Sequence, residues 1–321
     1  MYKDTNCGEP RESSVGSQIT VAGWVHRRRD HGNLIFIDLR DSSGLLQIVF
    51  NPEHSKDAHE LAGSLRSEWV IQVTGNVVAR LPGAENRELP TGTIELSAID
   101  LIVLNQSVTP PFEVSGDLEV DDNTRLKYRF MDLRRPRMQE LLKLRHRVTH
   151  MIWDYLSSKG FTQVETPILI KSTPEGARDY VVPSRIHPGE FYALPQSPQQ
   201  LKQLLMVSGV ERYFQIARCF RDEDLRADRQ PEHTQLDFEM SFVHRDDVMA
   251  IVEDLYTRIV KETAPEASIS VHFTRLTYAE AMERFGTDKP DLRFDMELST
   301  LTEIAASSDA RVFQSVASSG G

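Results

Sequence analysis

The feature that most constrains the fold of this chain is a highly charged segment between two strand-like runs. Residues 213–220 are mostly apolar, residues 221–234 mix arginines with carboxylates, and residues 235–242 alternate between polar and apolar side chains. Because successive side chains of a strand point to opposite faces, the last run has one apolar face and one polar face that includes Asp237. A charge-rich surface hairpin is the simpler explanation, but carboxylates in register on one face favour a substrate pocket.

The composition is that of an ordinary globular protein with enough length for two domains. The chain has 321 residues, of which 40% are hydrophobic and 26% are charged, and its net charge is −11. This acidity argues against bulk binding of nucleic acid, yet positive charge is concentrated in residues 27–29 and again in residues 125–147. Local basic strips on an acidic chain are typical of a protein that binds its partner in one defined orientation. They also occur on ordinary solvent-exposed faces.

Nothing in the sequence predicts a secreted or membrane protein. No apolar run is long enough to cross a bilayer, and the first residues lack the apolar core of a signal peptide. The two cysteines, Cys7 and Cys219, provide neither a disulfide framework nor a metal-binding cluster. We therefore expect a cytoplasmic protein without a membrane partner.

The first hundred residues predict a small β-barrel. A helix is expected at residues 54–66, between the third and fourth of five strands, because alanines and leucines recur there at helical spacing. Three strands, a helix and two more strands are the order of an OB-fold, a barrel that binds nucleic acid on one face. The expected strands are residues 19–25, 34–39, 45–50, 70–78 and 94–103.

A linker and a long helix are expected to follow the barrel. Residues 106–122 show little periodicity and contain several breakers, which indicates a connection between domains. A helix is predicted from Pro136, a favourable first-turn residue, to the helix-ending Gly160. A strand is predicted at residues 161–169, and Pro167 inside it indicates a sheet edge or an interface.

Three more helices are predicted in the second half of the chain. The first should begin at Ser197 as the candidate N-cap, with Pro198 in the first turn and Gln200 as the reciprocal capping side chain. The other two are expected at residues 246–262 and 277–285, where apolar side chains recur at helical spacing.

The segment FRDEDLRADRQPEHTQLD, residues 220–237, resembles motif 2 of class II aminoacyl-tRNA synthetases, and specifically of the bacterial aspartyl-tRNA synthetase family. The predicted long helix and the strand with Pro167 resemble motif 1, which builds the homodimer interface in that family. The resemblance implies an α+β multidomain protein, with an OB-fold anticodon-binding barrel followed by an antiparallel β-sheet catalytic core. It also implies an aspartate–tRNA ligase whose substrates are ATP, L-aspartate and tRNA(Asp), with Mg²⁺ as the metal.

The resemblance further implies domain boundaries and an incomplete core. Residues from about 288 on resemble the start of a domain that bacterial members insert into the catalytic sheet, and no Gly-rich motif 3 occurs. We therefore expect the Mg²⁺ ligands to lie outside this chain and the chain alone to be inactive; a gene fragment and a truncated paralogue both stay open. The expected parts are the barrel at 1–106, a linker or hinge at 107–135, the catalytic domain at 136–287 and the start of the insertion at 288–321.

By resemblance, the charged loop binds ATP. Arg221 would bridge the α-carboxylate of aspartate and the α-phosphate of ATP, because a fixed guanidinium can fork onto a carboxylate and stabilise phosphoryl charge. Asp222 belongs to the same set, Glu223 would meet the adenine amino group, and Gln230 would lie along the nucleotide. His233 would stack on adenine, or else be a hydrogen-bonded loop histidine.

The aspartate site is also implied by resemblance. The substrate ammonium would be held by Glu175, Ser197, Gln199 and Asp237, and its side-chain carboxylate would face Lys202. Such a pocket rejects asparagine because the wrong substrate leaves a buried charge unpaired. Without the resemblance, Ser197 would be only a helix cap and Lys202 only a surface lysine.

The barrel carries the implied anticodon site. Phe36 would stack on an unpaired base, unless it belongs to the barrel core, and Arg29 and Gln47 would read base edges. His31 stands where strict tRNA(Asp) enzymes typically have leucine, which favours an enzyme that also charges tRNA(Asn). The alternatives are an asparagine- or lysine-specific relative and a non-catalytic protein that binds the tRNA anticodon.

Overall fold

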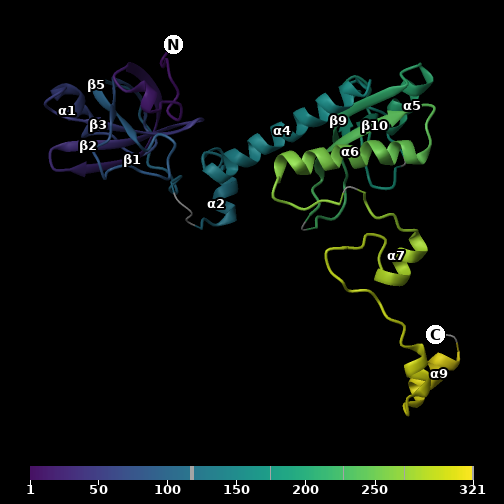
Figure 1. Cartoon of the computed structure of the whole chain (residues 1–321). Helices are drawn as coiled ribbons and strands as arrows, with labels where there is room; N and C mark the ends of the chain where they lie inside the picture. The colour runs from purple at the N-terminus through teal and green to yellow at the C-terminus, as the bar shows by residue number, and fades with distance from the viewer. Residues whose placement is uncertain (116–118, 174, 227, 271, 320–321) are drawn as a thin grey trace. The chain divides into compact units, whose positions relative to one another are not determined.

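The structure is a computed structural model that describes residues 1–115, 119–173, 175–226, 228–270 and 272–319 (Figure 1). It contains two compact units, Met1–Arg145 and His146–Gly321, which are described separately. Residues 320–321 of the expected insertion, and Pro174 and Ala227 of the substrate loops, lie outside the described residues. The four domain boundaries expected from the sequence stay predictions.

The first unit contains the predicted five-stranded barrel. It closes in the order β1-β2-β3-β5-β4, with β3 and β5 parallel and the other pairs antiparallel. Each strand carries apolar residues at alternate positions, and these form one buried core inside the barrel. The strands are β1 (Gln18–His31), β2 (Leu34–Asp41), β3 (Gly44–Phe50), β4 (Val70–Ala79) and β5 (Ile94–Asn105), with helix α1 (Lys56–Ala62) between β3 and β4.

Two local features shape the barrel. Gly75 is required where β4 crosses β5, because a Cβ atom there would lie 2.4 Å from the carbonyl oxygen of Ser97. Helix α1 begins at Ser55, whose hydroxyl accepts a hydrogen bond from the amide of Ala58, and ends at Gly63. The helix expected at residues 54–66 was therefore predicted in the right place but too long.

The segment after the barrel ends in two short helices, the first of which begins at the last residue of the linker expected at residues 106–122. Helices α2 (Asp122–Lys127) and α3 (Arg129–Asp132) lie within it. The Asp132 carboxylate is fully buried and pairs with Arg125, at 3.0 Å, and with Arg129. The basic strip seen in the sequence is thus organised around one buried acid, a contact between distant positions that periodicity does not reveal.

The second unit is built on a hairpin of two long strands, β9 (Arg212–Phe220) and β10 (Glu232–Met240), joined by the charged loop. The apolar face of the hairpin packs against the end of α4 (Pro136–Ser158) and against α6 (Arg245–Thr263), as Figure 1 shows. Tyr155, Leu156, Phe214 and Leu255 are buried between them. The predicted long helix from Pro136 and the alternation in β10 are confirmed.

Strand β6 (Thr162–Gln163) corrects the prediction of a strand at residues 161–169. Only two residues pair with β9, in parallel, and the amide of Val164 then donates to the carbonyl of Phe214. Pro167 lacks an amide N–H, so the chain leaves the sheet before it.

The remaining elements are short. The strands are β7 (Val181–Pro183) and β8 (Phe191–Ala193), and the helices are α5 (Gln199–Val207), α7 (Tyr278–Phe285), α8 (Thr302–Ser307) and α9 (Arg311–Ser318). The side chains of Thr277 and Glu280 cap α7 reciprocally, and Gly286 ends it in the left-handed conformation with φ of 68°. The prediction for this helix is confirmed.

Candidate functional site

The polar face of the β9–β10 hairpin carries a buried charge cluster. Gln215 and Asp237 lie opposite each other in the strand register, and helix α5 places Lys202 above them. The Lys202 ammonium lies 3.1 Å from Oδ1 of Asp237, 3.2 Å from its Oδ2, and 3.3 Å from Oε2 of Glu239. Lys202 is 8% exposed, so the expectation of a mere surface lysine is wrong.

The surroundings of Asp237 disfavour the charged form of its carboxyl group. Burial raises its pKa, Lys202 opposes that rise, and the nearby Glu239 and Glu175 add to it. Its Oδ1 atom is buried and makes no hydrogen bond within the described chain, although the Lys202 ammonium is within ion-pair distance. A hydrogen bond requires a suitable angle as well as a short distance, so an ammonium can lie within ion-pair distance of Oδ1 without a hydrogen bond to it. This oxygen can therefore accept a hydrogen bond from a cationic ligand.

Two loops complete the polar face. The Ser197 hydroxyl donates to Oε2 of Glu175 at 2.7 Å, so these two predicted residues are in contact. Ser197 is not a helix cap: α5 begins at Gln199, its N-cap is Pro198, and no side chain caps it. The prediction of Gln200 as a reciprocal cap is wrong for the same reason, because the helix starts one residue later than expected. Gln199 opens the first turn of α5, three residues before Lys202.

Gln196 connects the two loops and was missed from the sequence. It is 2% exposed, its Nε2 donates to the carbonyl of Ala177 at 2.8 Å and also to Asp179, and its Oε1 accepts from the amide of Ala177. A buried glutamine that uses both ends of its amide fixes the relative position of the loops that carry Glu175 and Ser197. Its only sequence signal is a polar residue next to Pro195.

The charged loop folds over a cavity of about 330 Å³. Arg221, Glu223, Gln230 and His233 line it, so the structure brings four of the five predicted ATP residues together. The Arg221 amide donates to the carbonyl of Pro231 at 2.8 Å and closes the base of the loop. The fifth residue, Asp222, is not among the lining residues; its amide donates to the carbonyl of Arg178.

The Arg221 guanidinium is available for a ligand. Its Nε atom is buried and has no hydrogen-bond partner among the residues that the structure describes. Cys219 lies between Arg221 and Asp237: burial and then Asp237 raise the pKa of its thiol to about 11, whereas Arg221 lowers it. The thiol is therefore protonated at neutral pH and is no nucleophile.

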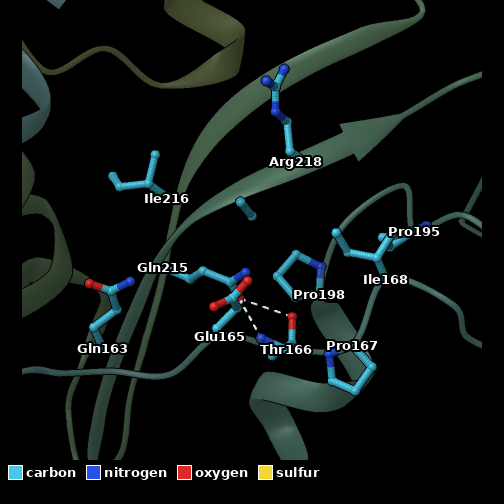
Figure 2. Close-up of a pocket in the computed structure, with 11 residues that line it drawn as sticks. Gln163, Glu165, Thr166, Pro167, Ile168, Pro195, Pro198, Gln215, Ile216 and Arg218 are labelled. Atoms are coloured by element: carbon cyan, nitrogen blue, oxygen red, sulfur yellow. Dashed lines mark hydrogen bonds between the residues drawn. The ribbon is translucent and has the colours of Figure 1, made fainter. Parts of the chain in front are cut away.

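Figure 2 shows a second cavity, of about 240 Å³, beside the polar face. Here Thr166 donates to Oε1 of Gln215 through its hydroxyl at 2.9 Å and through its amide at 3.3 Å. The Tyr213 hydroxyl donates to the same oxygen at 2.9 Å. Gln215 lies on β9 opposite Asp237, so these hydrogen bonds attach the segment before Pro167 to β9. Sequence analysis missed this role.

The barrel contains a cavity of about 420 Å³ lined by all four predicted anticodon residues: Arg29, His31, Phe36 and Gln47. Phe36 is partly exposed and lies outside the barrel core, and His31 meets its ring edge-on, with centroids 6.4 Å apart. Arg29 donates to Oδ1 of Asp38 at 2.6 Å and to Oε1 of Gln47 at 3.2 Å.

Arg80 lines the same cavity and was missed from the sequence. Its Nη2 atom is buried without a hydrogen-bond partner in the described chain, as is Nε of Arg29. Its only sequence signal is an arginine that follows β4 directly. Two arginines with unused donors suit hydrogen-bond acceptors on a base edge or a phosphate.

No group of three or more histidine, cysteine or acidic side chains in the described ranges could hold a metal ion. No helix of the described chain has the length and apolar character of a membrane span.

Comparisons with known proteins point to one family. The family described as tRNA synthetases class II (D, K and N) matches residues 121–310, and the family described as OB-fold nucleic acid binding domain matches residues 19–104. In fold, the chain is similar to an asparaginyl-tRNA synthetase from Pyrococcus horikoshii. The TM-score is 0.73 at 24% identity, over 83% of this chain and 59% of that one.

Curated relatives are similar over the full length of the chain. An aspartate–tRNA(Asp/Asn) ligase from Rubrobacter xylanophilus is 57% identical over 320 residues, which are 100% of this chain and 53% of the relative. A ligase of the same name from Dehalococcoides mccartyi is 55% identical over 321 residues, 100% of this chain and 54% of the relative. The chain spans about half the length of the curated relatives it matches.

Proposed function

We propose that this chain, which belongs to the class II tRNA synthetases of the D, K and N group, carries the anticodon-binding and amino-acid-activating parts of an aspartate–tRNA ligase. The observation that carries the proposal is the pair of unused buried atoms on the polar hairpin face, Nε of Arg221 and Oδ1 of Asp237. One is a cationic donor and the other an anionic acceptor, which together match the carboxylate and the ammonium of an amino acid.

The proposed reaction forms aspartyl-adenylate. The α-carboxylate of aspartate attacks the α-phosphate of ATP and pyrophosphate leaves; the aspartyl group then passes to the tRNA 3′ end. Asp237, Glu175 and Ser197 would bind the ammonium, and Gln199 is proposed to assist them. Arg221 would stabilise the charge that builds on the phosphoryl oxygens, because it lines the cavity and its buried Nε atom has no hydrogen-bond partner in the described chain.

Lys202 would select aspartate over asparagine. It lies between Asp237 and Glu239, two carboxylates whose ion pairs hold its ammonium in place. A substrate carboxylate would accept a charge-assisted hydrogen bond from the Lys202 ammonium, whereas the neutral amide oxygen of asparagine would accept a weaker one.

ATP and its metal complete the proposed site. Glu223, Gln230 and His233 line the cavity next to Arg221 and would bind adenine and ribose; Asp222 is proposed to assist from the loop backbone. Mg²⁺ would neutralise phosphate charge when bound, and its ligands would come from outside the described residues.

A homodimer and a cytoplasmic location are part of the proposal. Helix α4 exposes large apolar side chains, with Leu141, Leu142 and Trp153 each 44–48% exposed. A second copy that packs on the region of α4 and Pro167 would cover them.

The decisive experiment is Arg221→Lys in the whole protein that contains this chain. Aspartate-dependent ATP–pyrophosphate exchange should fall about 10²-fold or more, because an ammonium cannot fork between carboxylate and phosphate. Arg218→Lys is the matched control, since Arg218 lies on β9 three residues before Arg221, is paired with Glu232 at 2.8 Å and does not line the nucleotide cavity. Near-wild-type exchange in folded Arg221→Lys protein would refute the role assigned to Arg221, whereas no exchange in the wild-type protein would favour a non-catalytic tRNA-binding protein.

Charging of tRNA(Asn) as well as tRNA(Asp) is a second proposal. It is supported by the place of His31 in the barrel cavity, where its ring nitrogens offer a donor or an acceptor beside Phe36. The relatives from Rubrobacter and Dehalococcoides carry both tRNAs in their names. Charging assays on the two purified tRNAs decide: refusal of tRNA(Asn) ends this proposal and leaves the first intact.

A further inference from the structure

A buried ionic cluster joins the barrel to the segment that follows it. Glu68 lies just before β4, is 2% exposed, and accepts two charged hydrogen bonds on one oxygen, Oε2. One comes from Arg40 of β2 at 2.8 Å and the other from Arg134, after α3, at 2.6 Å. Residues 40, 68 and 134 are far apart in sequence, so this contact fixes the late segment on the barrel.

Arg134 makes a second contact with the barrel. Its guanidinium lies over the ring of Trp24, 5.1 Å from the centroid, and Trp24 is the register partner of Arg40 in the β1–β2 ladder. Arg134 thus touches both strand β1 and the residue that lies two positions before β4, and its side chain is only 29% exposed.

Arg40 is itself oriented by a further group. Its Nη1 donates to Nδ1 of His26 at 2.8 Å. Burial, and next the positive charge of Arg40, lower the pKa of His26, so the ring is neutral at neutral pH and its nitrogen can accept. His26 lies on β1, three residues before Arg29 of the candidate anticodon site.

The backbone of Glu68 is specially arranged for this contact. Its φ of 65° is in the left-handed region, which residues with a side chain rarely adopt. The conformation is held by two hydrogen bonds of 2.8 Å, from the Glu68 amide to the carbonyl of Val25 and from the Val25 amide to the carbonyl of Trp69. A disfavoured conformation that aims a buried acid at two arginines indicates a functional constraint.

We propose that Glu68 and Arg134 are positioning residues that clamp the hinge segment, residues 122–135, onto the barrel, so that the two bind tRNA as one body. The inference rests on the proposed tRNA-binding function. When the anticodon is bound in the barrel, the rest of the tRNA lies at a fixed place relative to the hinge segment. The contact between the tRNA and the hinge segment then forms at a high effective concentration. Freeing the hinge leaves the anticodon contacts intact and lowers this effective concentration.

The test uses the 321-residue chain with Arg134→Ala, and with Glu68→Gln as the second variant. The control is Arg137→Ala, which removes the same charge from an exposed position with no described contact. Two ligands are compared, an isolated anticodon stem–loop of tRNA(Asp) and the whole tRNA(Asp). Hydrogen exchange of the α3 amides is followed in parallel, because it reports on the clamp without any RNA.

In both variants we expect α3 amides to exchange at least tenfold faster. Stem–loop affinity should stay within twofold of wild type, while the preference for whole tRNA over the stem–loop should fall about fivefold or more. Unchanged exchange in α3, or an equal loss of affinity for both ligands, would overturn the clamp. If wild-type protein binds neither RNA, the tRNA-binding proposal fails, and the exchange data alone still decide whether the hinge is clamped.

Discussion

Lys202→Met should destabilise the second unit by about 3 kcal/mol near pH 7.5. The change removes the only charge that the structure places between Asp237 and Glu239 among the described residues, while methionine keeps the length of the side chain. Breaking one partner of a buried ion pair costs about 3–5 kcal/mol. The Asp237 side chain is 10% exposed and that of Glu239 is 30% exposed, so Glu239 can recover water and the low end of the range applies.

The loss should shrink in acid. The native pKa of Asp237 is already raised by burial, and removal of Lys202 raises it further. A carboxyl whose folded pKa lies above its unfolded pKa favours the folded state below the unfolded value, and this contribution disappears as pH rises through the folded value. The deficit of the variant should therefore be smaller near pH 4.5 than near pH 7.5, because the protonated Asp237 carboxyl no longer needs Lys202.

Urea unfolding followed by Trp153 fluorescence measures this effect in the correct unit. The chain has three tryptophans; replacing Trp24 and Trp69 by Phe leaves Trp153, which packs edge-on against Phe214 at 6.0 Å. Lys171→Met is the control, because Lys171 is exposed and makes no described ion pair. A loss below about 0.5 kcal/mol near neutral pH, or a loss that is equal at both pH values, would refute the electrostatic reasoning.

Three further outcomes are expected. Gly75→Ala should destabilise the barrel by about 2 kcal/mol or more in urea, because its Cβ would meet the Ser97 carbonyl at 2.4 Å. Ser55→Ala, which removes the cap of α1, should cost about 1 kcal/mol, whereas Ser197→Ala should cost less, because it removes only an exposed hydrogen bond to Glu175; a loss at Ser197 as large as that at Ser55 would contradict the finding that Ser197 does not cap α5. Residues 1–106 should fold alone and bind an anticodon stem–loop weakly, as calorimetry and fluorescence anisotropy would report, because the core cluster lies within the barrel.

Periodicity was sufficient to predict the elements that bury one face. The five barrel strands, the long helix from Pro136 and the alternation in β10 all carry apolar side chains at the spacing of their own geometry. The strand at residues 161–169 was wrong because its length is set by pairing with β9, a long-range contact that local pattern does not encode. The helix at Ser197 began late because that hydroxyl bonds to Glu175 instead of the helix end.

The residues missed at the candidate sites share one property. Gln196, Gln215 and Arg80 are polar side chains whose partners come from other segments of the chain. In the sequence each is an isolated polar residue without a motif, so its role depends on tertiary contacts. Glu68 belongs to the same class, because its partners lie 28 and 66 residues away.

Buried polar atoms without a hydrogen-bond partner distinguish the candidate binding sites from the purely structural parts of the described chain. Buried donors and acceptors are almost always paired, and an unpaired one costs about 1–3 kcal/mol. In the described chain, the buried side-chain atoms without a hydrogen-bond partner belong to Arg29, Arg80, Arg221 and Asp237. Two line the barrel cavity and two lie on the polar hairpin face, and three of the four were predicted site residues. The structural clusters around Asp132 and Glu68, by contrast, satisfy their buried carboxylates internally. In the described chain, the buried side-chain atoms that lack a hydrogen bond thus lie at the candidate sites, and ligand binding should stabilise each unit by supplying those hydrogen bonds.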